Sequence, residues 1–372
     1  MSLLSRFSCP FCFETYTLRE VQYACSAGNV SQPAPREREP IACKHKPACT
    51  CDGLATLRQC PKCGAVIPQI FLETEFLPFS ILGDQGSGKT TYITVVMKEL
   101  EDAAGDLQLS LSHQSDDTIM KMEEDRTRIY RDGAKLDMTN IGQPVPQVWR
   151  VTNNTRRRHN TYNFTIFDGA GEIIRNIGRY PLEVRYIKAS RAILLLLDPL
   201  RLQNLIANGG IWPEDAKNSH TAQIDDVYRD TRNAGAIVTA IADAICVARG
   251  MRKTRLDIPT AVVITKFDLL DHRLPAGSLV TSYGTIFRDG RVDLQACSQM
   301  DREIVAWLTA ERETAFLEAV RSSFSNFTFF GVSNFGKPPP DEYSAPAGIT
   351  PRRVLDPMLW LFHKLGFIDG GR

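Results

Sequence analysis

The chain has 372 residues, of which 43% are hydrophobic and 23% are charged. This length can bury one large core, or a core plus a small additional domain, so we expect a globular protein. The 44 Lys and Arg residues nearly balance the 43 Asp and Glu residues, and the net charge of +1 excludes a general attraction to nucleic acid or to an anionic membrane. The longest wholly apolar run, Ala192–Leu197, is far shorter than the roughly 20 residues that a membrane helix needs.

The N-terminal sequence reaches a cysteine pair, Cys9 and Cys12, too soon for the apolar core and cleavage site of a signal peptide. We therefore expect a cytoplasmic protein without a membrane segment. No repeat with a fixed period of about 20 to 50 residues is visible, which argues against a solenoid or a propeller.

Cysteine usage predicts a separate zinc-binding, zinc-ribbon-like domain at residues 1–68, followed by a linker at residues 69–77. Eight of the ten cysteines precede residue 64. A Cys-x-x-Cys pair can hold one tetrahedral Zn²⁺ from a tight turn, and two such pairs close a four-sulfur site. The predicted zinc ligands are Cys9, Cys12, Cys25, Cys43, Cys49, Cys51, Cys60 and Cys63.

The pairing of these ligands is not defined by the sequence. Eight cysteines can fill two zinc sites, and the 47 residues between Cys12 and Cys60 leave room for the second, although His45 can replace one cysteine. The alternative, a disulfide framework, requires an oxidising compartment. Cys246 lies in an apolar helical pattern, and both Cys246 and Cys297 are predicted to be packing residues.

Residues 83–90 read GDQGSGKT and match the phosphate-binding Walker A pattern, GxxxxGK[ST]. In this pattern glycines let backbone N–H groups surround a phosphate, so Lys89 is expected to reach the β and γ phosphates and Thr90 to bind Mg²⁺. An apolar segment at 76–82 precedes the loop and a helical pattern comes after it, as the motif requires. The predicted phosphate-site residues are Gly83, Asp84, Gln85, Gly86, Ser87, Gly88, Lys89, Thr90 and Thr91.

The remaining elements predict an α/β domain. A charged helical segment at 116–131 precedes two alternating stretches, 145–151 and 162–168, which are expected to form a hairpin. Buried strands are expected at 192–198, 259–268 and 326–333, and helices at 226–250, 300–320 and 354–367. This alternation predicts a mostly parallel sheet with one antiparallel strand, covered by helices on both faces, with ligands at the carboxyl ends of its strands.

The motif order over residues 78–336 resembles that of TRAFAC-type, Ras-like GTPases. Asp168-Gly169-Ala170-Gly171 is similar to the DxxG switch motif, and Thr265-Lys266-Phe267-Asp268 is similar to NKxD with Thr in place of Asn. Ser333 matches the serine of the SAK loop, where Asn334 replaces the usual Ala. The resemblance implies a Ras-like P-loop three-layer domain over residues 78–372 that binds GTP or GDP with Mg²⁺.

The resemblance also implies roles for these residues. Asp168 would orient Mg²⁺, and Gly171 would donate its amide to the γ phosphate. Asp268 would accept hydrogen bonds from guanine N1 and the exocyclic amine, with Lys266 packed along the base. The alternative for Asp268 is a residue that ends a strand and caps the next segment of the chain.

Two assignments by resemblance concern the switch segments. Thr139 is our choice for the switch I threonine, ahead of Thr118 and Thr127, which lie in a helical pattern, but Thr139 can equally be an ordinary loop residue. Glu172 stands where many Ras-like proteins carry Gln. It can act as a base, point outward until a partner binds, or mark slow intrinsic hydrolysis, because a carboxylate beside a γ phosphate would repel it.

The whole-chain layout, from the cysteine-rich head to the terminal "PMLWLFHKLGF", resembles the bacterial double-GTPase family, which is inferred to act in conflict or defence systems. This favours a GTPase switch with a zinc head that recruits a protein partner. An ATPase or P-loop kinase, and a non-hydrolysing adaptor that docks protein or nucleic acid, remain alternatives. The basic turn at residues 156–158 can contact phosphates or be a solvated loop, and the oligomeric state is not defined by the sequence.

Overall fold

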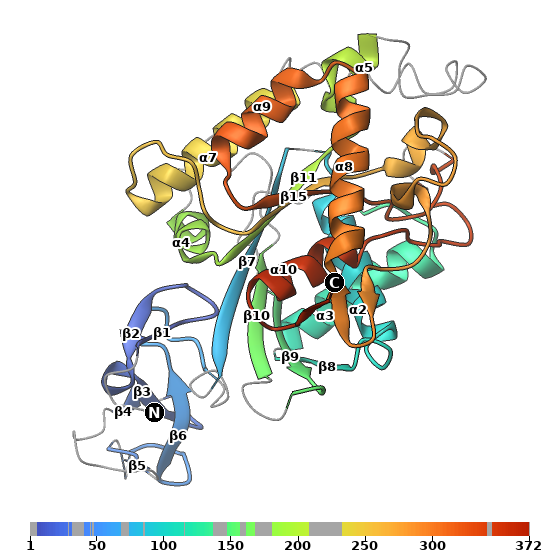
Figure 1. Cartoon of the computed structure of the whole chain (residues 1–372). Coiled ribbons are helices and arrows are strands. Elements are labelled where there is room, and N and C mark those ends of the chain that lie inside the picture. Colours follow the sequence, from blue (N-terminus) through green and yellow to red (C-terminus); the bar gives the residue numbers. More distant parts are fainter. Residues whose placement is uncertain are drawn as a thin grey trace.

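The computed structural model of the chain describes residues 6–28, 30–31, 41–44, 46, 48–67, 74–84, 86–114, 116–136, 147–156, 161–167, 181–207, 233–340 and 344–371. These residues form a central sheet with helices on both of its faces, together with a small cysteine-rich N-terminal part (Figure 1). Within the described part, no helix is both long and apolar enough to cross a membrane.

A seven-stranded sheet in the order β15-β12-β11-β7-β10-β9-β8 forms the centre of the molecule. Its strands are β7 (Glu75–Gly83), β8 (Leu109–His113), β9 (Gln147–Asn153), β10 (Thr161–Phe167), β11 (Ala192–Leu197), β12 (Thr260–Ile264) and β15 (Phe327–Gly331). β9 pairs antiparallel with both β10 and β8, whereas β10, β7, β11, β12 and β15 are mutually parallel. The predicted fold class is therefore confirmed, with β9 as the one reversed strand.

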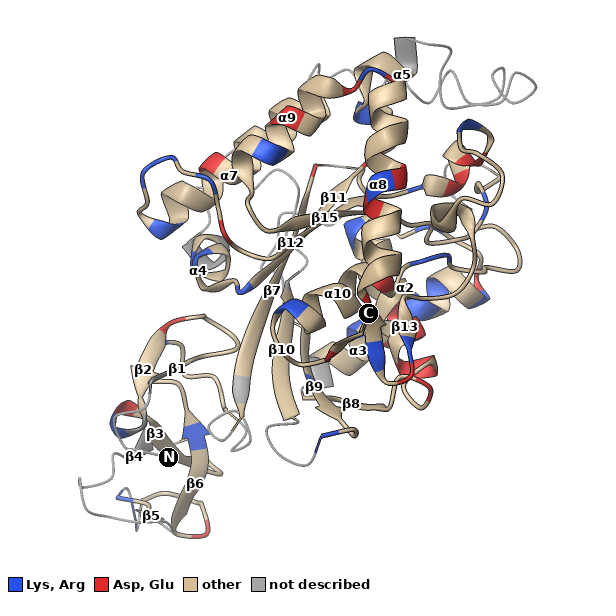
Figure 2. Ribbon diagram, viewed as in Figure 1, with Lys and Arg blue, Asp and Glu red and all other residues tan. Residues whose placement is uncertain are grey.

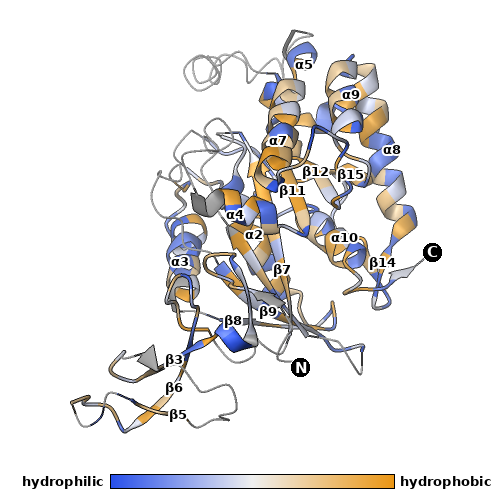
Figure 3. Cartoon of the chain, turned by 90° about the vertical axis from the view of Figure 1, so that its left-hand side faces the viewer, coloured by the Kyte–Doolittle hydropathy of each residue, from blue (hydrophilic) through white to orange (hydrophobic). Residues whose placement is uncertain are grey.

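The inner strands are continuous apolar runs because both of their faces are covered. Every residue of β11 and β12 is buried. Figure 2 shows these strands free of charged residues, with Lys, Arg, Asp and Glu placed on the surrounding helices and loops. The same division appears in Figure 3, where hydrophobic residues gather on the central strands.

Helices cover both faces of the sheet. They are α2 (Lys89–Asp102), α3 (Asp116–Arg126), α4 (Pro181–Ala189), α5 (Gln203–Ala207), α7 (Ala234–Arg249), α8 (Leu294–Ala310), α9 (Thr314–Ser323) and α10 (Asp356–Lys364). α7 packs against α4 and α9 on one face. On the other face Phe362 of α10 contacts Phe79 and Phe164, at centroid distances of 5.8 Å each. Successive residues of a strand point to opposite faces, so Phe79 faces α10 while Ser80 reaches Ser190, just after α4.

The structure differs from the predicted elements in two places. The single helix expected at 300–320 is two helices, α8 and α9, separated at Arg312, whose φ of 63° is left-handed and cannot continue a helix. The strand β8, at the edge of the sheet beside β9, was not predicted. Helix α7 starts at Ala234 after an Asn233 cap, and residues 226–232 of the predicted helix lie outside the described part.

The N-terminal part consists of short strands: β1 (Arg6–Ser8), β2 (Thr15–Thr17), β3 (Gln22–Cys25), β4 (Val30–Ser31), β5 (Ile41–Ala42) and β6 (Leu54–Gln59). β1 pairs with β2, and the other four form a sheet in the order β4-β3-β6-β5. We refer to residues 6–67 as the head. The head lies beside β7 (Figure 1). Phe13 of the head contacts Phe76 and Tyr186, and Glu14 Oε1 lies 3.2 Å from Arg185 Nη1.

Candidate nucleotide site and cysteine clusters

The Walker A segment forms a tight loop between β7 and α2. A methyl group at Gly83 would lie 2.4 Å from the Leu196 carbonyl oxygen and 2.7 Å from Ser87 Oγ, so only glycine fits there. Gly86 and Gly88 have φ values of 80° and 77°, in the left-handed region that glycine adopts without strain. The glycines of the pattern are thus required by the backbone of the loop.

Lys89 is the first residue of α2 and is 8% exposed. Its Nζ donates to the carbonyl oxygens of Gly83 (3.0 Å) and Asp84 (2.9 Å), which holds the ammonium group across the loop. Thr90 and Thr91 come next in the first turn of α2, where backbone N–H groups have no carbonyl four residues earlier to bond. This end of the helix therefore offers donors and a cation to a phosphate.

An ion pair that sequence analysis missed braces the loop. Asp84 Oδ2 lies 2.8 Å from Arg201 Nη2, and both side chains are almost fully buried. Arg201 ends the short helix η5 (Pro199–Arg201), directly after β11. The sequence gives no sign of this ion pair, because nothing in the local pattern of "DPLR" indicates a partner more than 100 residues away.

The carboxyl ends of β7, β11, β12 and β15 lie at one edge of the sheet, which brings the predicted base-binding residues toward the loop. Thr265 follows β12 and donates from N and Oγ1 to the Leu197 carbonyl, at 2.9 and 3.2 Å. Lys266 has a left-handed φ of 52°, and its Nζ lies 2.5 Å from Asp198 Oδ2. Asp198, not predicted as a site residue, thereby ties the end of β11 to the Thr265-Lys266 turn.

Asp268 and Ser333 are brought together. Asp268 lies in the first turn of the short helix η7 (Phe267–Arg273), and Ser333 follows β15. Burial raises the pKa of the Asp268 carboxyl, while a hydrogen bond from Ser333 and the charge of Arg352 oppose that rise. The carboxylate therefore has a hydroxyl donor and a nearby cation that favour its ionised form.

We refer to residues 332–336, "VSNFG", as the Ser333 turn. Asn334 links this turn to the phosphate-binding loop. A methyl group at Gly88 would lie 3.6 Å from Asn334 Nδ2, so the amide is adjacent to the start of α2. Asn334 Oδ1 and Ser87 Oγ are buried and have no hydrogen-bond partner in the part of the chain that the structure describes. Buried polar atoms of this kind indicate an acceptor or donor supplied by a ligand or water.

Several predicted site residues lie outside the described residues: Gln85, Thr139, Asp168, Gly171 and Glu172, together with His45. The two alternative candidates for the switch I threonine lie within the described residues. Thr118 lies in α3 and accepts a hydrogen bond from the Val148 backbone N at 3.1 Å, and Thr127 begins the π-helical turn η2 (Thr127–Arg131).

The eight head cysteines form two tetrads: Cys9, Cys12, Cys60 and Cys63, and Cys25, Cys43, Cys49 and Cys51. Within each tetrad the four Sγ atoms lie within 4.8 Å of one another, and all eight cysteines are free. This geometry resolves the pairing that the sequence left open, with the two Cys-x-x-Cys turns sharing one cluster.

The tetrads have the dimensions of four-sulfur metal sites. Sγ–Sγ distances are 3.8 Å for Cys9–Cys63, 3.7 Å for Cys12–Cys60 and 3.5 Å for Cys25–Cys49. A tetrahedron of sulfurs about 2.3 Å from Zn²⁺ has edges of about 3.8 Å. The Cys9 thiol donates hydrogen bonds to the thiolates of Cys60 and Cys12. These bonds lower the pKa of Cys60 to about 5 and the pKa of Cys12 to about 7.

Other residues of interest have structural partners. Cys246 and Cys297 are buried in the main core, as predicted. Arg156 of the basic turn donates to the Gly366 carbonyl at 2.6 Å and pairs with Asp369, while residues 157–159 lie outside the described part.

The family model described as Double-GTPase 2 matches residues 78–338. The chain belongs to the Double-GTPase 2 family. The match extends from β7 through the Ser333 turn and contains the phosphate-binding loop, "DGAG", "TKFD" and "VSNFG". Membership of this family supports a GTP-binding domain, and it confirms the resemblance that the motifs and the layout indicated.

Individual relatives of this Double-GTPase 2 member are distant. The putative ESX-1 scaffolding and assembly protein SaeC of Mycolicibacterium smegmatis is 21% identical over 333 residues, which are 83% of this chain and 80% of the relative. The GTP-bound GTPase-like domain of Ski7 from S. cerevisiae has 13% identity and a TM-score of 0.32, over 73% of this chain and 46% of the Ski7 chain. The Arl6 BBS3 small GTPase from Trypanosoma brucei has 12% identity and a TM-score of 0.28, over 70% and 87%. The chain thus spans less than half the length of the Ski7 structure.

Proposed function

We propose that this chain is a Mg²⁺-dependent GTP-binding and GTP-hydrolysing switch protein whose zinc-binding head recruits a protein partner. The main support for this proposal is that the predicted phosphate-binding and base-binding residues lie at the same edge of the sheet. The phosphate-binding loop follows β7, and the Asp268–Ser333 pair follows β12 and β15, in a member of the Double-GTPase 2 family.

The phosphate side of the site would work mainly by electrostatic stabilisation. Lys89 and the loop amides would stabilise charge on the β and γ phosphate oxygens. Thr90 and Asp168 would hold Mg²⁺, which neutralises phosphate charge when bound. Thr139 and Gly171 would contact the γ phosphate, so that hydrolysis releases the segments that carry them.

On the base side, Asp268 would accept hydrogen bonds from guanine N1 and the exocyclic amine. Adenine has no proton on N1 and no amine on C2, so the pair of bonds would select guanine. Thr265, Lys266, Ser333 and Asn334 would complete this part of the site, with Lys266 along the base.

Zinc binding by the two tetrads is supported by their Sγ spacing and by the absence of disulfides among the described cysteines. We propose two Zn²⁺ ions in a zinc-binding domain of residues 1–68, followed by a linker at 69–77 and a GTPase domain at 78–372. Eight free thiolate ligands require a reducing compartment, so the cytoplasm is the proposed location.

The proposed partner is a protein. The relative from Mycolicibacterium smegmatis is described as a scaffolding and assembly protein, which favours protein contacts over nucleic acid for this chain as well. A role in a bacterial conflict or defence system is the proposed context.

Competition for a fluorescent guanine nucleotide tests the guanine assignment. Unlabelled GTP should displace the label and ATP should not; displacement by ATP at similar concentrations would instead support an ATPase or P-loop kinase. Turnover tests hydrolysis: GTP should be hydrolysed over multiple turnovers, and Lys89→Ala should abolish this. A protein that binds GTP tightly without turnover would be a nucleotide-binding adaptor.

Glu172 is tested separately by its Glu172→Gln and Glu172→Ala variants. If both variants turn over GTP at the wild-type rate, the residue has no catalytic role.

A further inference from the structure

The Ser333 turn is held from outside by a later segment of the chain. Arg352 and Ser333 exchange two backbone hydrogen bonds of 2.9 and 3.0 Å, and Thr350 N donates to the Phe335 carbonyl at 3.1 Å. The holding segment lies beyond residue 338, where the family match ends. The base side of the site therefore depends on residues outside the recognised motifs.

The side chain of Arg352 reaches a second element of the site. Its guanidinium, 4% exposed, binds both carboxylate oxygens of Asp271, at 2.9 and 2.6 Å, and donates to the Thr281 carbonyl at 3.3 Å. Asp271 lies in η7, three residues after Asp268. Residues three apart in a 3₁₀-helix lie on the same side of the helix. The Arg352 guanidinium therefore binds the side of η7 that carries Asp268.

Two routes thus lead from Arg352 to Asp268. One runs through the backbone to Ser333, whose hydroxyl binds Asp268. The other runs through the guanidinium to Asp271 and the helix η7. A two-point contact of a planar guanidinium fixes direction as well as distance, which a single hydrogen bond or a lysine cannot do.

We propose that Arg352 is a positioning residue that fixes Asp268 for guanine recognition. This inference rests on the proposed function and adds a specificity determinant outside the matched motifs. The positive charge of Arg352 also favours the ionised form of Asp268, the form that accepts both guanine donors.

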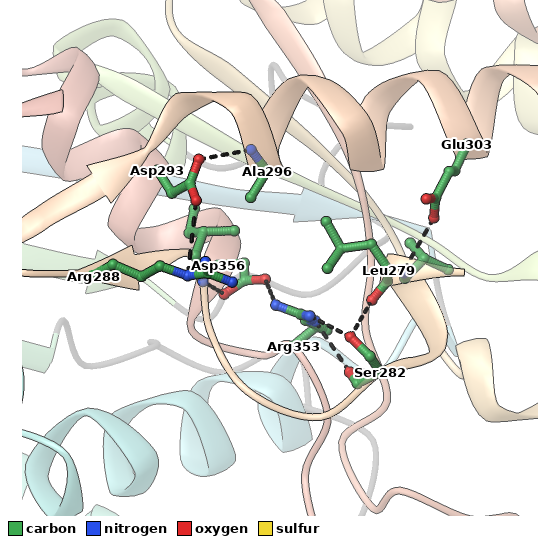
Figure 4. Close-up of polar contacts among 10 residues, drawn as sticks. Leu279, Ser282, Arg288, Asp293, Ala296, Glu303, Arg353 and Asp356 are labelled. Atoms are coloured by element: carbon green, nitrogen blue, oxygen red, sulfur yellow. Dashed lines mark hydrogen bonds and ion pairs between the residues drawn. The ribbon is translucent and has the colours of Figure 1, made fainter. Parts of the chain in front are cut away.

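The neighbouring Arg353 provides a matched control. Its side chain is equally buried, but it donates to the Ser282 carbonyl at 3.1 Å and pairs with Asp356 at 3.3 Å (Figure 4). Asp356 in turn accepts a hydrogen bond from the Ile286 backbone N at 2.9 Å. Arg353 therefore stabilises the same segment through residues that do not belong to η7 or to the Ser333 turn.

The test compares GDP with inosine diphosphate, which lacks the exocyclic amine that donates to Asp268. Displacement of fluorescent GDP from the full-length, zinc-loaded protein gives the ratio of the two dissociation constants. Arg352→Lys keeps the positive charge but loses the two-point contact with Asp271. It should reduce the preference for GDP over inosine diphosphate by about tenfold. Asp271→Asn should do the same, and the double variant should lose little more because both changes break one interaction. Arg353→Lys should leave the ratio within about twofold of wild type.

The outcomes separate the two levels of the proposal. If Arg352→Lys keeps the wild-type preference, or if Arg353→Lys reduces it equally, Arg352 only stabilises the segment and the inference is wrong while guanine binding stands. If the wild-type protein itself fails to prefer GDP, the proposed guanine recognition is wrong and the inference falls with it. Should Arg352→Lys fail to fold, Asp271→Asn decides, because Asp271 is 45% exposed and the Asn side chain keeps its size and one acceptor oxygen for the Arg352 guanidinium.

Discussion

Replacing Gly336 by Ala should damage the base side of the site through a defined clash. Gly336 has a φ of 78°, and a methyl group there would lie 2.1 Å from the Thr350 carbonyl oxygen and 2.7 Å from Thr350 Oγ1. The left-handed backbone alone costs an alanine about 1 to 2 kcal/mol. To relieve the clash, the segment 350–352 must move away from the Ser333 turn.

That movement would break the three backbone hydrogen bonds that join the two segments, at about 1 kcal/mol each. The total loss of unfolding free energy is therefore about 4 to 5 kcal/mol. GDP affinity should fall as well, because Gly336 N donates to Ser333 Oγ at 2.8 Å and Ser333 binds Asp268.

Gly366→Ala is the matched control for this variant. Gly366 has a similar φ of 76°, but nothing lies within 4 Å of the added methyl group, so only the backbone cost of about 1 to 2 kcal/mol applies. Urea unfolding of zinc-loaded samples gives both free energies, and fluorescent GDP binding gives the affinities. Equal destabilisation by the two variants, with unchanged GDP affinity, would refute the reasoning.

Four further predictions concern the proposed ligands. Asp268→Asn should weaken GDP binding by about 10- to 100-fold and favour xanthine diphosphate, as measured by displacement of fluorescent GDP. Lys89→Ala should reduce the rate of GTP hydrolysis by about 100-fold or more in a phosphate-release assay. Metal analysis should find two zinc ions per chain, and Cys60→Ser or Cys49→Ser should each remove one of them. GDP affinity should fall as the pH decreases towards the raised pKa of the Asp268 carboxyl, because only the ionised carboxylate accepts both guanine donors. This fall should begin at a higher pH than an ordinary aspartate would give, and Asp268→Asn should abolish it.

The sequence predicted those parts of the fold that depend on local pattern. The runs of β11 and β12 were found because a strand buried on both faces is apolar throughout, and the hairpin β9–β10 was found because its apolar and polar residues alternate. The edge strand β8, "LSLSH", was missed because it has only two apolar residues. The break between α8 and α9 was missed because neither Gly nor Pro marks it: Arg312 adopts the left-handed conformation that glycine usually takes.

The zinc-ligand pairing required three-dimensional information of a different kind. Eight ligands with two metal ions allow many partitions, and no local rule chooses among them. The structure brings Cys12 and Cys60 together over 48 residues, and the sheet β4-β3-β6-β5 brings Cys25 at the end of β3 near the inner cysteines. The spacing of each Cys-x-x-Cys turn was informative because its two ligands are local.

The difference between local patterns and contacts over long sequence distances also explains why the guanine motifs could be recognised in the sequence, whereas the residues that hold them in place could not. Asp268 and Ser333 stand in short motifs at the ends of predicted strands, but Arg352 meets Asp271 across 81 residues, in a loop without periodicity. In sequence, two adjacent arginines after a proline indicate a solvated basic turn. Burial of a guanidinium is costly unless a carboxylate and further acceptors satisfy it, so the observed pair requires both partners at once. A change at either partner leaves the other charge without its partner beside the base site, and this makes Arg352 and Asp271 sensitive positions although neither belongs to a recognised motif.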